Sequence, residues 1–205
     1  MEELEIVERF RFECSPKLSC FNTCCTNLSI ALTPYDILML SRGLETTTGE
    51  FLRKYTTWHI GIATGMPVVT FKEDNCPFVS REGCRVYSHR PTACRLYPLA
   101  RVKVGDEEFY FLIREDFCLG HGGKEWSVEE WLEDQGVKNY NRMNDVFFEL
   151  VALKPKLSKE LAERIVKIVF DIDGFKKEME IEDDEEALKV SVKVAAELMR
   201  EEGAV

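Results

Sequence analysis

Residues 76–98 read CPFVSREGCRVYSHRPTACRLYP, and this stretch carries three of the eight cysteines in the chain. The next cysteine, Cys118, opens the run CLGHGG over residues 118–123. Thiolates are soft ligands that select zinc, copper(I) or iron–sulfur clusters over hard cations. Because metal binding and folding are coupled, a segment so rich in thiols is expected to take its shape together with a metal.

The other four cysteines precede residue 26 and form a second group with the spacing C-x5-C-x3-C-C. The group that begins at Cys76 has wider gaps, C-x7-C-x9-C-x23-C. Neither spacing matches paired C-x2-C zinc knuckles or the bacterial ferredoxin run. Four sulfurs per group is nevertheless the number that a tetrahedral zinc or a cubane cluster requires. We therefore predict eight metal ligands: Cys14, Cys20, Cys24, Cys25, Cys76, Cys84, Cys94 and Cys118.

Local sequence supports several of these assignments. Cys24 and Cys25 are adjacent, so both can serve one metal only in a tight turn; otherwise they serve two neighbouring sites, or one is spare. Cys94 follows Pro91 within one predicted helical turn, whose unpaired amides can hydrogen-bond a thiolate. The glycines after Cys118 are expected to let the backbone approach a bulky inorganic centre closely. Either His89 or His121 could join a mixed site, although a hydrogen bond to a ligand is the more usual role.

Disulfides are the main alternative for so many cysteines. Oxidised scaffolds of this kind are usually short secreted chains, whereas this chain has 205 residues and 45% hydrophobic composition, enough for a packed core. Its first residues, MEELEIVER, are charged and lack the apolar region of a signal peptide. The sequence contains no apolar run of about 18 residues. We expect a cytoplasmic protein with no membrane partner.

The formal net charge of −10 makes nucleic acid a poor partner, because phosphate binding requires a basic face. Residues 171–205 contain 12 acidic and 5 basic side chains, which is typical of a solvated acidic segment. By contrast, six arginines lie between residues 81 and 114, among the cysteines of the second group. They are either ordinary surface residues or offset the negative charge of a thiolate-ligated centre.

The coarse pattern predicts an α+β fold in a single domain over residues 1–205. Residues 12–123 form an irregular cysteine-rich metal-binding region, in which the first 30 residues read as loop. Within it, helices are expected after Thr33-Pro34 and over 48–55, and a strand over 67–71. A turn at Glu82-Gly83, a strand over 85–87 and a helical turn from Pro91 follow. A hairpin around Gly105-Asp106 joins residues 99–104 to 107–113.

Residues 127–205 are predicted to be a helical layer with an acidic C-terminal segment. Ser127 and Glu130 form a capping box. Helices are expected at 137–153, 158–170 and 183–202, separated by Lys-Pro and Asp-Gly breaks. Their apolar residues recur at helical spacing and are expected to form core: Phe147, Phe148, Leu150, Leu161, Ile165, Ile168, Leu188, Val192, Ala195 and Leu198.

The motifs from residue 12 to about 123 resemble the YkgJ-type cysteine-cluster family, whose members are described as zinc- or iron-chelating. The similar residues are Cys24-Cys25, CPF at 76–78, Gly83-Cys84, Tyr87, HRP at 89–91, CRLYP at 94–98 and CLGHG at 118–122. The stretch HRPxxCRxYP is the most specific part. The first group departs from the family's C-x2-C-x2-C-C spacing. A distant relative, the flagellin lysine methylase, has a similar cluster with an iron–sulfur centre and uses S-adenosylmethionine.

Three functions follow as hypotheses. The first is an iron–sulfur or zinc protein whose centre is structural or transfers electrons, with a protein or redox partner. The second, suggested by the methylase, is an S-adenosylmethionine-dependent protein methyltransferase, in which Arg90 and Arg95 would bind the cofactor carboxylate. The third is zinc storage or delivery. The arginines and the glycines after Cys118 favour an iron–sulfur cluster of the 4Fe–4S type over zinc.

Overall fold

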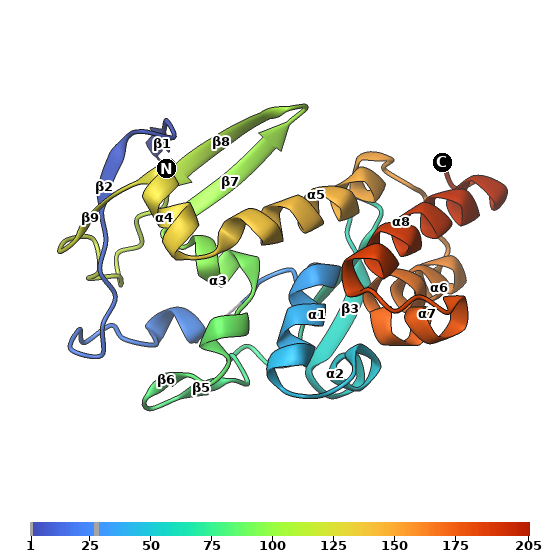
Figure 1. Ribbon diagram of the computed structural model, residues 1–205, viewed down its shortest axis with the longest axis horizontal. Coiled ribbons are helices and arrows are strands. Elements are labelled where there is room, and N and C mark those ends of the chain that lie inside the picture. Colours follow the sequence, from blue (N-terminus) through green and yellow to red (C-terminus); the bar gives the residue numbers. More distant parts are fainter. Residues whose placement is uncertain (1, 27–28) are drawn as a thin grey trace. The chain divides into compact units, whose positions relative to one another are not determined.

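The computed structural model describes residues 2–26 and 29–205 (Figure 1). The chain divides into two compact units, each made of two segments. Unit 1 comprises Met1–Leu28 and Asp74–Asn139, and unit 2 comprises Ser29–Glu73 and Tyr140–Val205. Helices account for 45% and strands for 18%, which confirms the mixed α+β class. Whether these two units associate into the single domain expected from the sequence stays a prediction.

The main sheet of unit 1 is antiparallel, with the order β1-β8-β7. The predicted hairpin is confirmed: β7 (Leu99–Val104) and β8 (Glu107–Leu112) are joined by a turn in which Gly105 has a φ of 61° (Figure 1). Strand β1 (Glu2–Leu4) adds to the free edge of β8. The prediction that the first 30 residues are all loop was therefore wrong, because pairing with a strand more than 100 residues away leaves no local signal.

A second pairing in unit 1 joins β2 (Arg9–Arg11) to β9 (Glu125–Ser127). Helix α4 (Val128–Asp134) follows directly, and the predicted capping box of Ser127 and Glu130 is confirmed. These elements enclose an apolar core to which β1, β2, the β7–β8 hairpin, α3 and α4 contribute. The core consists of Leu4, Phe10, Phe12, Leu96, Leu99, Tyr110, Leu112, Val128, Trp131, Leu132 and Val137.

The segment between the first two cysteines of the second group forms a small hairpin, β5 (Val79–Ser80) with β6 (Gly83–Cys84). The predicted strand over 85–87 is wrong, since pairing ends at Cys84 and a 3-10 helix, η2 (Tyr87–His89), follows. The helical turn from Pro91 is confirmed as α3 (Thr92–Leu96).

Unit 2 is mainly helical. The predicted helix after Thr33 is α1 (Pro34–Gly43), with a capping box formed by Thr33 and Asp36, and α2 (Thr48–Tyr55) has another at Thr47 and Glu50. Strand β4 (Pro67–Phe71) is confirmed and pairs with an unpredicted partner, β3 (Thr56–Ile60). The C-terminal helices are α5 (Val137–Ala152), which begins in unit 1, α6 (Lys159–Phe170), α7 (Ile172–Met179) and α8 (Asp184–Glu201).

Helix α7 contradicts the predicted Asp-Gly break, because Asp173 and Gly174 lie inside it. The carboxylate of Asp171 caps this helix by accepting a hydrogen bond from the Gly174 amide at 3.2 Å. A Cβ at position 174 would lie 2.7 Å from a carboxylate oxygen of Asp171. Glycine at position 174 therefore leaves room for the capping carboxylate of Asp171, and it does not end the helix.

The predicted core positions in unit 2 are largely buried. Phe148 is an exception, with 47% of its surface exposed, because its neighbour Phe147 already faces the core and successive helical residues diverge by about 100°. Ile168 and Leu198 are half-buried. Within the described residues, no helix combines the length and the apolar character that crossing a membrane requires.

Arg42 joins three elements of unit 2. Its guanidinium donates hydrogen bonds to both oxygens of Asp173, at 3.0 and 2.7 Å, and to both oxygens of Asp184, at 2.9 Å each. Burial is the largest single cause and would raise the pKa of each carboxyl. The hydrogen bonds and charge of Arg42, together with Thr48 at Asp173 and Lys176 at Asp184, outweigh it, and both pKa values are lowered. One cation thus holds the end of α1 to the first turns of α7 and α8.

We expect Arg42→Ala to lower the free energy of unfolding by about 2 kcal/mol, between the values for exposed and for buried ion pairs. Because the folded-state pKa values of Asp173 and Asp184 are depressed, this stabilisation is present above about pH 4 and is lost as the pH falls further. Urea unfolding from pH 7 to pH 3 measures both effects. Arg164→Ala, which removes an exposed pair with Glu202, is the control and should cost at most about 0.5 kcal/mol. A gap between wild type and Arg42→Ala that is as large at pH 3 as at pH 7 would contradict this account.

Candidate metal centre

All eight cysteines lie in unit 1, four in each of its two segments, and none forms a disulfide. Residues 29–73, which separate the two sequence groups, belong to unit 2. The thiols are therefore gathered by the folding of distant segments rather than by their spacing. The side chains that act on one another form two overlapping sets: a Cys24 group (Cys24, Cys25, Cys76 and Cys84) and a Cys118 group (Cys14, Cys20 and Cys118). The two sets are linked, because Cys24 also acts on Cys14.

The adjacent cysteines lie in a tight turn, η1 (Thr23–Cys25). Asn22 precedes it with a φ of 69°, in the left-handed region that asparagine tolerates better than most residues. Its side-chain amide donates to the carbonyl of Ser80 at 2.9 Å, which ties the turn to the β5–β6 hairpin. The amide of Cys76 donates to the carbonyl of Cys25 at 2.9 Å, so the pair is held beside the first cysteine of the other segment.

The thiols of Cys24, Cys25 and Cys76 interact directly. A hydrogen bond with the Cys25 thiol is the main cause that lowers the pKa of Cys24 to about 7 and that of Cys76 to about 6. The amides of Phe78 and Val79 also lower the pKa of Cys76. The pKa of Cys25 is raised, because its proton is engaged with both neighbours. The sulfur of Cys25 therefore lies between the other two sulfurs, within hydrogen-bond reach of each.

Cys84 completes this group at the end of β6. Burial is the main cause that raises its pKa, while the amide of Val86 and the charge of Arg90 act in the opposite direction. Cys94 lies on α3, one turn from Arg90, and its charge acts on the same guanidinium. Arg90 is therefore the cation that faces Cys84 and Cys94.

The Cys118 group combines cysteines from the two sequence groups. Burial, followed by the proximity of Cys24, Cys20 and Cys118, raises the pKa of Cys14. The amide of Leu119 donates to the sulfur of Cys20 at 3.3 Å. The amide of Glu13 donates to the carbonyl of Gly120 at 2.9 Å. The loop after Cys118 is thus bonded to the segment that carries Cys14 and to Cys20 itself.

Two glycines of this loop are needed for packing within the chain. A Cβ at Gly120 would lie 2.8 Å from the ring of Phe12, and a Cβ at Gly123, where φ is 70°, would overlap the Glu13 carboxylate. A Cβ at Gly122 would meet nothing within 4 Å. Glycine at positions 120 and 123 therefore lets the loop approach residues 12–13, and the approach of the backbone to an inorganic centre stays a prediction.

Arg90 and Arg95, predicted to bind a cofactor carboxylate, are buried in unit 1, with 7% and 8% of their surface exposed. Arg95 donates to the carbonyl of Arg90 at 3.1 Å, to the carbonyl of Gln135 at 2.7 Å, and to that of Ser88. Arg90 donates to the carbonyl of Tyr87 at 2.6 Å and to the side chain of Gln135, and it stacks on the Tyr87 ring. These contacts hold the segment that carries Cys94 to the end of α4.

Two further residues beside the thiols were missed or left undecided from the sequence. The hydroxyl of Tyr97 is buried without a hydrogen bond of good geometry, although burial and the neighbouring Cys118 thiol raise its pKa. Both ring nitrogens of His121 are buried without a hydrogen-bond partner, and burial, then Arg114, lowers the pKa of this histidine. Tyr97 lies within the most specific sequence stretch, which is the signal that could have identified it. His89 lies in η2.

The thiols approach one another without forming a finished coordination polyhedron. In residues 2–26 and 29–205, no three side chains of histidine, cysteine, aspartate or glutamate have the mutual spacing of a metal site. The donor set nevertheless suits zinc or an iron–sulfur cluster, since it consists of thiols, two of them with lowered pKa values, in a unit that also buries arginine. The final convergence of the sulfurs is the step that a metal would drive.

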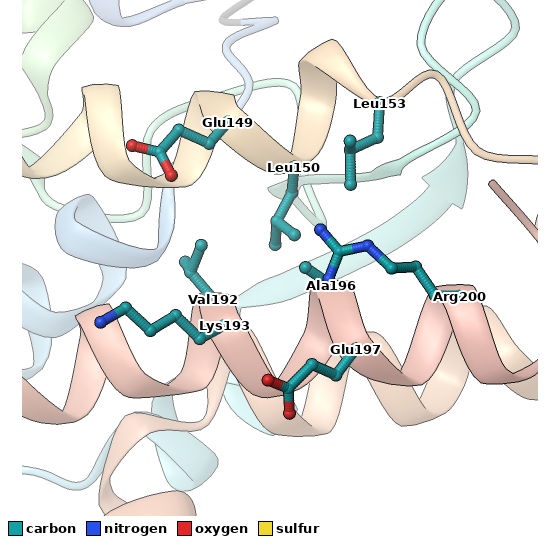
Figure 2. A pocket seen from close by; sticks show the side chains of 8 residues that line it. All are labelled: Glu149, Leu150, Leu153, Val192, Lys193, Ala196, Glu197 and Arg200. Atoms are coloured by element: carbon teal, nitrogen blue, oxygen red, sulfur yellow. The ribbon is translucent and has the colours of Figure 1, made fainter.

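A hollow of ≈ 290 Å³ lies in unit 2, between α5 and α8 (Figure 2). Leu150 and Val192 point into it, and Leu153 and Ala196 complete its apolar lining. Its charged residues are of both signs: Glu149, Lys193, Glu197 and Arg200. This volume is at or just below the lower limit for small-molecule sites, and the mixed charge selects no ligand class. We assign it no function.

Unit 1 thus has the features of a cysteine-cluster metal-binding protein. Residues 13–119 match the family CxxCxxCC, described as "Putative zinc- or iron-chelating domain". The match spans all eight cysteines and just over half of the chain, and the chain belongs to this family. No curated protein and no solved structure is significantly similar to it. The resemblance noted from the sequence is confirmed at the level of the family, and with it a metal-binding function.

Proposed function

We propose that the eight cysteines hold an iron–sulfur cluster, of the 4Fe–4S type, with a structural or electron-transfer role. The observation that carries this proposal is the hydrogen-bonded contact of Cys25 with Cys24 and with Cys76, which brings thiols of two distant segments together. Thiolates bind metal in competition with protons, so a site that has already lowered the pKa of two of three thiols is prepared for a cation at neutral pH.

The charge of the surroundings supports an anionic centre. Arg90 is buried, and the hydrogen-bond acceptors that hold it, the Tyr87 carbonyl and the Gln135 side chain, are neutral. A buried guanidinium without a compensating charge is costly. The acidic groups that favour the charge of Arg90 are, in decreasing order, Tyr87, Cys94 and Cys84. Arg85 adds a second positive charge beside Cys76. A cluster ligated by several thiolates provides the negative charge that these arginines balance.

The methyltransferase hypothesis receives less support. It assigned Arg90 and Arg95 to a cofactor carboxylate, and bidentate binding of that kind needs guanidinium donors that face the ligand. In unit 1 these guanidinium groups donate to carbonyls of Tyr87, Ser88, Arg90 and Gln135 and to the Gln135 side chain. The contacts favour a structural role for both arginines.

The test is anaerobic purification without added metal, followed by elemental analysis, acid-labile sulfide and an absorption spectrum. We expect iron and sulfide in near-equal amounts and a broad absorption band at about 400 nm, where thiolate-to-iron charge transfer absorbs. A colourless protein with one or two zinc ions would contradict the iron–sulfur proposal and support a structural or delivery site. A rise in melting temperature with S-adenosylmethionine would support the methyltransferase instead, because a ligand of the folded state stabilises it.

A further inference from the structure

Three buried polar atoms lie in the part of unit 1 that carries the Cys118 group: Nδ1 and Nε2 of His121 and the hydroxyl of Tyr97. Within the described residues neither nitrogen of His121 has a hydrogen-bond partner, and the Tyr97 hydroxyl interacts only with the thiol of Cys118. Leaving a buried polar atom unsatisfied costs about 1–3 kcal/mol, so native proteins rarely do so. An imidazole with both nitrogens unsatisfied is especially unusual, because one of them carries a proton and the other a lone pair. These atoms are suited to a ligand that is not part of the polypeptide.

Both rings are located by Phe12. The Phe12 ring packs edge-to-face on Tyr97, with centroids 5.7 Å apart, and on His121, with centroids 5.6 Å apart. Phe12 is two residues from Cys14, and His121 is three residues from Cys118. The bonds from Glu13 to Gly120 and from Leu119 to the sulfur of Cys20 then bring the segments that carry all three cysteines to the loop of His121.

We infer that His121 supplies a nitrogen ligand to a metal centre formed with Cys14, Cys20 and Cys118. This inference rests on the proposed function, that the cysteines hold metal. Three thiolates and one imidazole are a complete tetrahedral set for zinc, and an imidazole can replace thiolate on iron in a cluster. Tyr97 is placed to donate its hydroxyl proton to the sulfur of Cys118. Within the described residues no three of these donors have the spacing of a metal site, so metal binding requires their side chains to move closer together.

The alternative is that His121 only fills space against Phe12. His121→Phe separates the two roles, because phenylalanine keeps the ring contact and removes both nitrogens. His121→Cys restores a soft ligand at the same position. His59→Ala, at an exposed position in unit 2, and His89→Ala, in unit 1, are the matched controls. All proteins are purified anaerobically, and the metal content per chain and X-ray absorption at the metal edge are measured.

We expect the wild type to show nitrogen as well as sulfur around its metal. His121→Phe should lose this nitrogen together with the metal of one centre, and His121→Cys should regain that metal in an all-sulfur environment. Both controls should match the wild type. A wild-type metal with sulfur ligands alone, nitrogen retained in His121→Phe, or loss of the nitrogen in His89→Ala would overturn the inference while leaving metal binding by the cysteines intact. A wild type that contains no metal would instead remove the proposed function itself.

Discussion

Cys25→Ser is expected to remove the metal of the Cys24 group and to destabilise unit 1. The Cys25 thiol contacts both Cys24 and Cys76, and it is the only one of the three that interacts with both partners by hydrogen bonds. Loss of residues that merely support a ligand costs about 10–100-fold in metal affinity, so loss of a ligand should exceed 100-fold. Because metal binding contributes of order 10 kcal/mol to the folding of small metal domains, the melting temperature should fall as well.

Serine isolates the effect of the sulfur, since the main-chain bond from the Cys76 amide to the Cys25 carbonyl is unchanged by the substitution. We also predict loss of metal and a lower melting temperature for Cys84→Ser and Cys94→Ser. Metal content by elemental analysis and thermal unfolding with and without chelator measure the effects. Thr23→Ala, in the same turn as Cys25, is the control and should retain metal. Full metal content and an unchanged melting temperature in all three serine variants would contradict the assignment of these cysteines as metal ligands.

Arg95→Met is expected to have the largest effect on stability outside the cysteines. Methionine keeps much of the apolar stem but leaves the carbonyls of Ser88, Arg90 and Gln135 without their donor. Hydrogen bonds to charged groups are worth about 1.5–3 kcal/mol each, and their losses at one side chain are not additive, so we expect about 3–5 kcal/mol. For a chain of this size, that corresponds to a fall in melting temperature of about 10 °C.

Arg95→Lys should not rescue the loss, because an ammonium group cannot reproduce a fork that reaches three separate carbonyls. Arg85→Met is the control: its side chain is exposed and donates one hydrogen bond, to the carbonyl of Pro77 at 2.8 Å. Thermal unfolding monitored by tryptophan fluorescence suits the test, since Trp131 donates to the carbonyl of Leu96, next to Arg95. If Arg95→Met melts within about 1 °C of the wild type, the guanidinium is available to a carboxylate ligand, and the methyltransferase hypothesis regains support.

The features predicted correctly from the sequence are those that depend on neighbouring residues. Thr33 and Ser127 cap helices because the side chain and the amide that it accepts from are three residues apart. The turn at Gly105 is equally local. Strand β1 was missed because its only partner, β8, lies in another segment, and α7 was missed because a glycine that accommodates the Asp171 cap looks like a helix breaker.

The composition of the site was easier to predict than its grouping. Eight cysteines indicate metal whatever their order, but their spacing placed Cys118 with Cys94, whereas the fold brings it to Cys14 and Cys20. The same limitation applies to Tyr97 and His121, because Phe12, which contacts both rings, lies more than 80 residues before either in the sequence. The number of cysteines therefore predicts that the bound species is a soft metal, whereas the topology decides which thiols are near enough to bind it together.

The two-segment construction of unit 1 has a consequence during synthesis. Cys14, Cys20, Cys24 and Cys25 leave the ribosome about 90 residues before Cys118, and residues 29–73 emerge in between. At translation rates of about 5–20 residues per second, the early thiols wait roughly 5 to 20 s for their last partner. Throughout that interval they are exposed to oxidants and to any thiophilic ion in the surroundings. Loading of a centre that includes Cys118 is therefore a late event, which can be completed only once the nascent chain has passed residue 118.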